Sequence, residues 1–288
     1  MDQVDQFEAY RGKMFGIAYR MLGSVADAGD IVQDAYLRYQ TTPAESIRSH
    51  DAFLTTVVTR LCLNQLQSAR AQRETYLGPW LPEPLITEED PLATQAQTQE
   101  SISMAFLVLL ERLTPPERAV FLLREVFDYS YAEIAEIVEK EEATCRQIFR
   151  RAKKFVTERR PRFTHSTEEH HLLLQKFNEA VGEGNLDGLI HLLSDEVTLW
   201  ADGGGKIAGA ATRPVHGARS VARFILGSLR LLHGPYKTET TMANGEPAII
   251  LRVAGQPVIF IGVSMSDQTI GEIRVIGNPD KLRRILPA

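Results

Sequence analysis

DYSYAEIAEIVEKEEATCRQIFRRAKKFV, residues 128–156, contains two helical patterns joined by a short acidic turn. In the second pattern Ile148, Ala152 and Phe155 recur at helical spacing, which predicts an apolar stripe that packs on the preceding helix. Two short helices joined in this way are typical of a helix-turn-helix. The turn, at residues 139–141, has the sequence Glu-Lys-Glu and lacks the glycine that is usual there.

The second helix concentrates positive charge in a chain whose formal net charge is −5. Arginine pairs with guanine and glutamine with adenine in the major groove, and further cations bind phosphates. The rest of the chain is acidic, which disfavours avid binding to DNA by the protein alone. A helical hairpin with a solvated basic face is the alternative. The candidate DNA-binding residues of this helix are Arg146, Gln147, Arg150, Arg151, Lys153 and Lys154.

Composition narrows the class of protein. The chain has 288 residues, of which 44% are hydrophobic, enough for two or three ordinary domains. It has no apolar run of membrane-spanning length and no signal peptide pattern, so we expect a cytoplasmic protein that does not bind membranes. Cys62 and Cys145 fit neither a disulfide framework nor a metal site, and we expect two buried thiols in a reducing compartment. No metal, cofactor or catalytic residue is predicted.

The first 75 residues predict a helical bundle. A helix is expected from about Asp27 to Gln40, with Ile31, Ala35 and Leu37 facing inward. The same pattern places Asp30, Gln33 and Asp34 outward. A loop is expected from Thr41 to Asp51 and a long helix from about Ala52.

Prolines interrupt the helical pattern in YLGPWLPEPLITEEDP, which predicts a solvated linker over residues 76–98. Trp80 and Leu81 are costly to expose to water, so we expect this linker to dock on another part of the protein. A mobile spacer with an isolated tryptophan is the alternative.

The region after His165 predicts an α+β domain. Two helices are followed by a strand, a glycine loop and a third helix, and then by strands that alternate with turns at Asn244-Gly245, Gly255 and Asp267. This order favours an antiparallel sheet curved over the helices.

Two blocks of sequence resemble one family. LTPPERAVFLLREVFDYSYAEIAEIVEKEEATCRQIFRRAKKFV (residues 113–156) resembles the −35-reading domain of extracytoplasmic-function RNA polymerase sigma factors, and GSVADAGDIVQDAYLRY (residues 23–39) resembles their first domain. The resemblance implies that the protein binds promoter DNA and the RNA polymerase core, through the β′ coiled coil and the β flap. It implies core-binding roles for Asp30, Gln33 and Asp34. It also implies contacts with the −10 element by Arg48, Ser49, His50, Asn64, Gln65, Arg70 and Arg73.

Three further motifs resemble a subgroup with a fused SnoaL-like C-terminal domain: WLPEP (80–84), DGGGK (202–206) and NPDKL (278–282). In that subgroup the extra domain regulates the sigma factor in cis. The resemblance implies regulatory or interdomain roles for Trp80, Leu81, Pro82, Asp202, Gly203, Gly204, Gly205, Lys206, Asn278, Pro279, Asp280, Lys281 and Leu282.

The expected architecture is therefore multidomain, with two all-α sigma domains and an α+β SnoaL-like cone. We expect sigma region 2 at residues 1–75, the linker at 76–98, sigma region 4 at 99–162 and the SnoaL-like domain at 163–288.

Two other functions stay open for the C-terminal domain. Asp202 and His216, with Trp200 nearby, could form the general base of a cyclase or isomerase fused to a DNA-binding module. We favour instead that Asp202 caps its glycine turn and that His216 is a surface or hydrogen-bonded residue. The domain could also bind an unidentified small ligand and act as a sensor.

Overall fold

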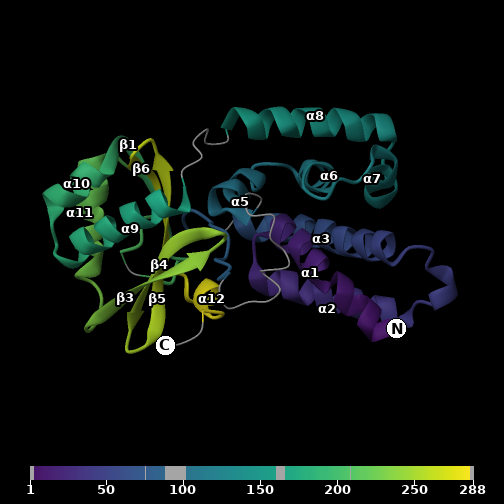
Figure 1. Ribbon diagram of the computed structural model, residues 1–288, viewed down its shortest axis with the longest axis horizontal. Helices are drawn as coiled ribbons and strands as arrows, with labels where there is room; N and C mark the ends of the chain where they lie inside the picture. The colour runs from purple at the N-terminus through teal and green to yellow at the C-terminus, as the bar shows by residue number, and fades with distance from the viewer. Residues whose placement is uncertain (1–2, 75, 88–101, 160–165, 208, 286–288) are drawn as a thin grey trace. The chain divides into compact units, whose positions relative to one another are not determined.

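The computed structural model describes residues 3–74, 76–87, 102–159, 166–207 and 209–285 (Figure 1). The chain forms two compact units: Met1–Glu74 with Glu89–Arg160, and Thr75–Glu88 with Pro161–Ala288. We call them the helical unit and the C-terminal unit. Among the described residues, no helix combines the length and the apolar character needed to cross a membrane.

The helical unit is built from helices whose starts are marked in the sequence by capping residues. Ser24 accepts a hydrogen bond from the Asp27 amide at 3.1 Å, and Ser130 and Glu133 form the expected capping box. The described elements are α1 (Gln3–Leu22), α2 (Val25–Thr41), η1 (Ala44–Ser46), α3 (His50–Glu74), α5 (Met104–Leu110), α6 (Pro115–Glu125), α7 (Tyr131–Val138) and α8 (Glu142–Arg159).

α7 and α8 form the predicted helix-turn-helix without a glycine. Glu139 ends α7 in the left-handed conformation at φ 54°, a geometry that costs a non-glycine residue about 1–2 kcal/mol. The buried stripe of α8 differs in one position from the prediction. Phe155 is only half-buried and lies beneath the Arg159 guanidinium at 4.2 Å. Val156 lies closer to the centre of the stripe, whose buried residues are Cys145, Ile148, Ala152 and Val156.

Leu37 does not face the core, contrary to the prediction. It is 53% exposed, whereas Ile31 and Ala35 are buried. Leu37 lies six positions after Ile31, and at about 100° per residue this turns its side chain about 120° away from Ile31 and about 160° away from Ala35. Of the three residues predicted to face inward, only Ile31 and Ala35 belong to the buried face of α2.

In the C-terminal unit, three helices cover one face of a six-stranded sheet of order β2-β1-β6-β5-β4-β3 (Figure 1). Leu174 and Phe177 of α9, Val221 of α11 and Ile273 of β6 belong to the core between them. The elements are α9 (Thr167–Gly182), α10 (Leu186–Leu192), β1 (Leu193–Asp202), β2 (Val215–His216), α11 (Ala218–Leu229), β3 (Tyr236–Ala243), β4 (Glu246–Val253), β5 (Gln256–Ser266), β6 (Thr269–Ile276) and α12 (Pro279–Leu282).

The sheet is mixed and not fully antiparallel as predicted. β1 pairs in parallel with β6, with Leu199 opposite Ile273, while β3 to β6 form the expected antiparallel meander. An alternating pattern marks a strand but does not fix the direction of its neighbour. The hairpin turn between β3 and β4 is the predicted one, with φ 55° at Asn244 and φ 73° at Gly245.

Residues 76–87 of the predicted linker belong to the C-terminal unit. Leu81 and Leu85 are each 2% exposed. Ile86 forms a β-bridge with Ala243, and the Thr87 amide donates to the Met242 carbonyl at 2.9 Å. A free spacer does not bury leucines or pair with a strand, so that alternative does not fit these residues. Residues 88–98 of the linker lie outside the described residues.

Cys62 and Cys145 are buried free thiols, as predicted. Burial raises the pKa of both groups, which keeps them protonated and unreactive.

Glu246, at the start of β4, predicts that the stability of the C-terminal unit depends on pH. Burial raises the pKa of Glu246, at the start of β4, to about 7 although Arg274 opposes the shift. An unfolded glutamate ionises near pH 4.5, so the free energy of unfolding should fall as pH rises from about 4.5 to 7. Glu246→Gln should therefore raise the melting temperature of the C-terminal unit at pH 8 and leave it unchanged at pH 4. Fluorescence of Trp80 and Trp200 reports this unit, and exposed Glu196→Gln is the control. Equal melting curves at pH 8 would contradict the prediction.

Candidate nucleic-acid interface and linker anchor

The candidate DNA-binding residues of α8 all lie on its exposed face. Cys145, Ile148 and Ala152 hold the opposite face against α6 and α7. Arg146 lies over the Tyr131 ring at 5.3 Å, which orients its guanidinium near the start of the helix. The exposed residues are Arg146, Gln147, Arg150, Arg151, Lys153 and Lys154.

Most of these cations have acidic partners in the helical unit. Lys153 pairs with Glu125 at 3.0 Å, Arg151 with Glu117 at 4.0 Å and Lys154 with Glu158 at 3.8 Å, and Arg146 pairs with Glu142. Arg150 has no ion-pair partner among the described residues. Exposed ion pairs contribute only about 0–1 kcal/mol each, so phosphates can replace these acids at little cost.

The residues predicted to bind core polymerase share one exposed face of α2. Asp30, Gln33 and Asp34 are all exposed, and Leu37 lies among them on the same side of the helix. An apolar side chain surrounded by acids and amides is typical of a protein-binding surface. The sequence pattern missed Leu37, but counting 100° per residue from Asp30 would have found it.

The residues predicted to bind the −10 element are partly used by the fold itself. Ser49 caps α3 by accepting the Ala52 amide at 3.3 Å. His50 is half-buried, and its Nδ1 lies 2.9 Å from the Tyr39 hydroxyl. Arg48 and Asn64 are exposed and Gln65 is half-buried. The side chains of Arg70 and Arg73 lie outside the described residues.

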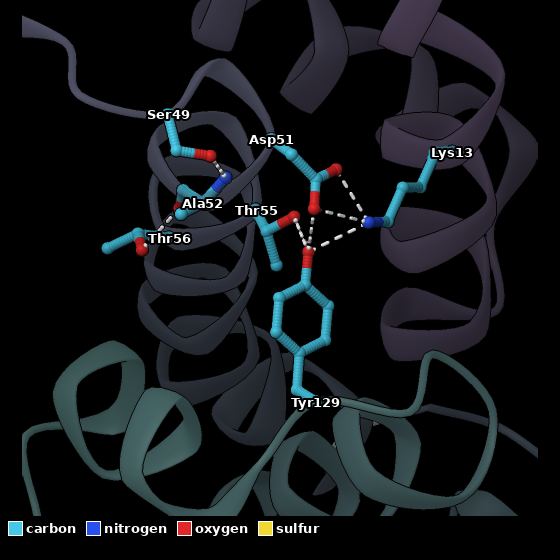
Figure 2. A network of polar contacts seen from close by, with 7 residues as sticks. All are labelled: Lys13, Ser49, Asp51, Ala52, Thr55, Thr56 and Tyr129. Atoms are coloured by element: carbon cyan, nitrogen blue, oxygen red, sulfur yellow. Dashed lines mark hydrogen bonds and ion pairs between the residues drawn. The ribbon is translucent and has the colours of Figure 1, made fainter.

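A polar network joins α1 and α3 to the segment just before α7 inside the helical unit (Figure 2). Lys13 Nζ of α1 lies 2.6 and 2.8 Å from the two Asp51 oxygens of α3. The Tyr129 hydroxyl, just before α7, donates to Asp51 at 2.8 Å and accepts from Lys13 at 2.8 Å. Thr55 Oγ1 lies 2.6 Å from the same hydroxyl. Burial opposes the charge of Lys13, but the bonds to Asp51 and Tyr129 raise its pKa.

Two arginines add helix-end contacts to this network. Arg60 of α3 donates to the carbonyls of Glu136 (2.8 Å) and Ile137 (3.1 Å) at the end of α7. Arg118 of α6, 3% exposed, donates to the Met21 carbonyl at the end of α1. Cations at helix C-termini satisfy unpaired carbonyls and oppose the negative end of the helix dipole. The two residues of each contact lie 76 or more positions apart in the sequence, so no local sequence pattern predicts these contacts.

Asp202 brings together the three motifs of the C-terminal unit. Its carboxylate is buried at 1% exposure. One oxygen accepts from the Tyr76 hydroxyl at 2.5 Å and from the Gly204 amide at 3.1 Å. The other accepts from the Leu81 amide at 2.8 Å and from Lys281 Nζ at 2.7 Å. We call this arrangement the Asp202 anchor. It joins WLPEP, DGGGK and NPDKL in one site.

Further contacts complete the Asp202 anchor. Lys281 lies over the Trp80 ring at 4.0 Å and also donates to the Leu81 carbonyl. The Asn278 amide donates to the Tyr76 hydroxyl at 2.9 Å, and burial together with the bond to Asp202 raises the pKa of that hydroxyl. Tyr76 carries no local sequence signal for this role, because its partners lie 126 and 202 residues away.

The glycine loop is shaped for close approach. Gly204 has φ 58°, and a Cβ there would collide with the Asn278 side chain. A Cβ at Gly203 would lie 2.6 Å from Ala210 Cβ. Lys206 at the end of the loop pairs with Asp280, and Asp280 also binds Arg283 at 2.7 Å. Pro279 and Leu282 belong to α12, and Pro82 is buried with Leu81.

This geometry does not suit a catalytic base. The four hydrogen bonds to Asp202 use the acceptor sites of both oxygens, so a substrate proton has no free lone pair to meet. His216 is exposed and contacts Thr198 at 3.1 Å, while Trp200 is half-buried on β1. Among the described residues, no group of His, Cys, Asp or Glu could hold a metal ion.

A helical bundle with an acidic outer face, followed by a helix-turn-helix with a basic outer face, defines a DNA-reading transcription factor. The family model for Sigma-70 region 2 matches residues 6–72, and that for Sigma-70, region 4 matches residues 103–156. The ECF RNA polymerase sigma factor SigJ of Mycobacterium tuberculosis is 37% identical over 97% of this chain and 93% of its own length. A probable ECF RNA polymerase sigma factor, SigI, of the same species is 29% identical over 96% of this chain and 93% of its own length.

A solved structure agrees with these matches. The crystal structure of the Mycobacterium tuberculosis extracytoplasmic function sigma factor SigJ matches with a TM-score of 0.77 at 36% identity, covering 97% of this chain and 98% of that one. The chain belongs to the extracytoplasmic-function group of RNA polymerase sigma factors, and it carries an α+β domain at its C-terminal end. Members of this family are non-enzymatic initiation factors that bind core RNA polymerase and promoter DNA.

Tyr129→Phe tests the network that joins the two sigma regions. The change leaves the buried Thr55 hydroxyl without its partner, which costs about 1–3 kcal/mol. Amide hydrogen exchange in residues 129–138 should become roughly tenfold faster. Tyr36→Phe removes an exposed hydroxyl that only accepts from Gln40, and should change nothing. Unchanged exchange in Tyr129→Phe would show that this network adds no stability.

Asp202→Asn tests the Asp202 anchor. The change removes the negative charge that pairs with the Lys281 ammonium in a largely buried site, at a cost of about 3–5 kcal/mol. We expect faster chymotrypsin cleavage after Tyr76 and Trp80 and a red shift of tryptophan fluorescence. Tyr76→Phe, which removes one donor, should give a smaller effect in the same direction. Exposed Asp195→Asn is the control, and cleavage no faster in Asp202→Asn than in this control would contradict the anchor.

Proposed function

We propose that this sigma factor reads the −35 element with α8, reads the −10 element with the region from residue 48 to α3, and is regulated in cis by the hold of its C-terminal unit on the linker. The observation that carries this proposal is the exposed basic face of α8 on a helix-turn-helix that follows region 2 in the chain. The chain acts in the cytoplasm and needs no cofactor or catalytic residue.

The face of α2 that carries Asp30, Gln33 and Asp34 binds the β′ coiled coil of the core. Leu37 supplies the apolar centre, because a 53% exposed leucine gains free energy when a partner covers it. The acids and the amide around it form the polar rim that fixes orientation. Region 4 binds the β flap in the same complex.

α8 enters the major groove with its N-terminal half. Arg146, Gln147 and Arg150 lie where side chains of a recognition helix reach base edges. Arg151, Lys153 and Lys154 lie farther along the helix and bind phosphates, which position the helix without reading sequence.

The −10 contacts are built differently. Arg48 is exposed beside the start of α3, while Ser49 and His50 hold the backbone of that corner in place. An unstacked base would be captured there, and the opened strand would follow α3 along Asn64, Gln65, Arg70 and Arg73. Polar and basic side chains along one helix suit a single strand without demanding one sequence.

Regulation in cis follows from the position of the Asp202 anchor. The anchored residues 76–87 lie in the chain between regions 2 and 4. Tyr76 forms this anchor together with residues of the three motifs, which form or support it: Trp80, Leu81, Pro82, Asp202, Gly203, Gly204, Gly205, Lys206, Asn278, Pro279, Asp280, Lys281 and Leu282. Release of residues 76–87 lengthens the connection between the two DNA-binding regions, and their capture shortens it.

Run-off transcription with core polymerase and promoters from the protein's own genome tests the proposal. The unaltered chain should support initiation at promoters with a defined −35 element. Arg146→Ala should lower initiation there by about 1–3 kcal/mol, or 5–150-fold, and should abolish the preference for one base. Lys154→Ala is the matched control and should weaken all −35 variants equally. Absence of transcripts from every promoter would overturn the proposed function, and an equal loss on all sequences in Arg146→Ala would assign that residue to phosphate.

A further inference from the structure

A second basic segment lies in the C-terminal unit, apart from the sigma regions. Between Asp202 and Glu239 the sequence contains no aspartate or glutamate. A chain with a net charge of −5 thus keeps one long stretch free of acids. The cations of this stretch are Lys206, Arg213, Arg219, Arg223, Arg230 and Lys237.

Three of these arginines form one line along α11. Arg219, Arg223 and Arg230 are four and seven residues apart, so they fall within about 40° of one another around the helix. Arg230 ends the helix in helical conformation and continues the line. The opposite face of α11 is buried through Val221 and Ile225 and packs on β1 and α10. We call the three residues the α11 arginine stripe.

The charges of the α11 arginine stripe are exposed to solvent and have no acidic partners among the described residues. All three arginines are exposed, and none has an ion-pair or hydrogen-bond partner within the parts of the chain that the structure describes. Gly227 lies between Arg223 and Arg230, and a Cβ there would meet nothing within 4 Å. On α8, by contrast, four of the six polar or basic residues have acidic partners. A solvated face of an acidic protein would attract such partners from its own chain.

We propose that the α11 arginine stripe binds the phosphate backbone of duplex DNA, so that the C-terminal domain is a third DNA-contacting part of this sigma factor. The proposal rests on the proposed function in one respect, since a promoter-binding protein brings DNA to this domain. It assigns to the SnoaL-like domain a contact that the Asp202 anchor does not provide.

The composition of this face favours DNA over an acidic protein. Ser220 and Gly227 are exposed between the arginines, whereas Leu226 on the same side of the helix is partly buried against the core and Leu231, 55% exposed, follows Arg230. Protein interfaces are organised around apolar or aromatic anchors, whereas DNA interfaces are polar and strongly positive. All three cations are arginines, whose planar fork binds phosphate oxygens in pairs. The stripe is about 16 Å long, which matches about five phosphates of one strand.

Salt dependence of DNA binding tests the inference. Fluorescence anisotropy of a labelled 40-base-pair duplex of mixed sequence is measured with the full chain between about 25 and 200 mM salt. The variant carries Arg219→Gln, Arg223→Gln and Arg230→Gln. Loss of three phosphate contacts should reduce the slope of log K against log salt by about 2.7. The advantage of the unaltered chain over the variant should then shrink about 40-fold between 50 and 200 mM salt.

A charge-matched control separates the stripe from net charge. Lys176→Gln, Lys237→Gln and Arg284→Gln remove three exposed charges scattered over the C-terminal unit. This control should keep the slope of the unaltered chain. Equal slopes in the two triple variants, or no binding by the unaltered chain at 25 mM salt, would overturn the inference. Tryptophan fluorescence and melting temperature confirm that both variants are folded.

Two additional arms distinguish this inference from other outcomes. Arg150→Gln on α8 should also weaken DNA binding; if it does and the stripe variant does not, the inference fails and the proposed function stands. Binding of fluorescent chain to core polymerase is measured in parallel. Loss of core binding with unchanged DNA affinity would assign the stripe to an acidic protein surface and overturn the DNA contact.

Discussion

The buried charge of Asp202 is the constraint on which the C-terminal unit and its linker depend. A carboxylate without water is tolerated only when its charge and its hydrogen bonds are satisfied. Here the donors come from residues 76–81, from the glycine loop and from Lys281. Because Tyr76 and Leu81 are among them, the chain is fixed to the C-terminal unit two residues after α3 ends at Glu74. The C-terminal unit is therefore completed by a segment that precedes region 4 in the sequence.

This connection limits how far apart the two DNA-binding regions can lie. The −10 and −35 elements are separated by about 25 base pairs, or about 85 Å of duplex. Residues 88–101 can span at most about 50 Å when fully extended, and release of residues 76–87 adds about 40 Å. While the Asp202 anchor holds, the length contributed by residues 76–87 is fixed by the fold of the C-terminal unit. On the proposed function, a single buried carboxylate sets the length of the connection between the two regions without touching DNA.

The sequence predicted what short-range physics determines. Capping boxes at Ser130-Glu133 and turns such as Asn244-Gly245 located the elements, because their signals lie within a few residues. The parallel pairing of β1 with β6 and the bond of Tyr76 to Asp202 depend on partners far away in the chain. The three motifs named most residues of the anchor, but only the fold reveals that one carboxylate joins them. Leu37 is a different case, because helix geometry alone is enough to place it on the exposed face of α2. The sequence pattern wrongly assigned it to the buried face.

The paired charges of α8 and the unpaired charges of the α11 arginine stripe suit two different tasks: selection among DNA sequences and general attraction to DNA. Acids of the helical unit pair with most cations of α8, so the exposed face of this helix carries little excess charge. Each exposed pair is weak, and DNA exchanges it for a phosphate with release of counterions. The α11 arginine stripe has no such acids, and its charge acts at longer range. On this assignment, the non-specific attraction to DNA comes from α11 in the C-terminal unit, and α8 is left to discriminate between sequences. The connection between the two is adjusted by capture or release of residues 76–87.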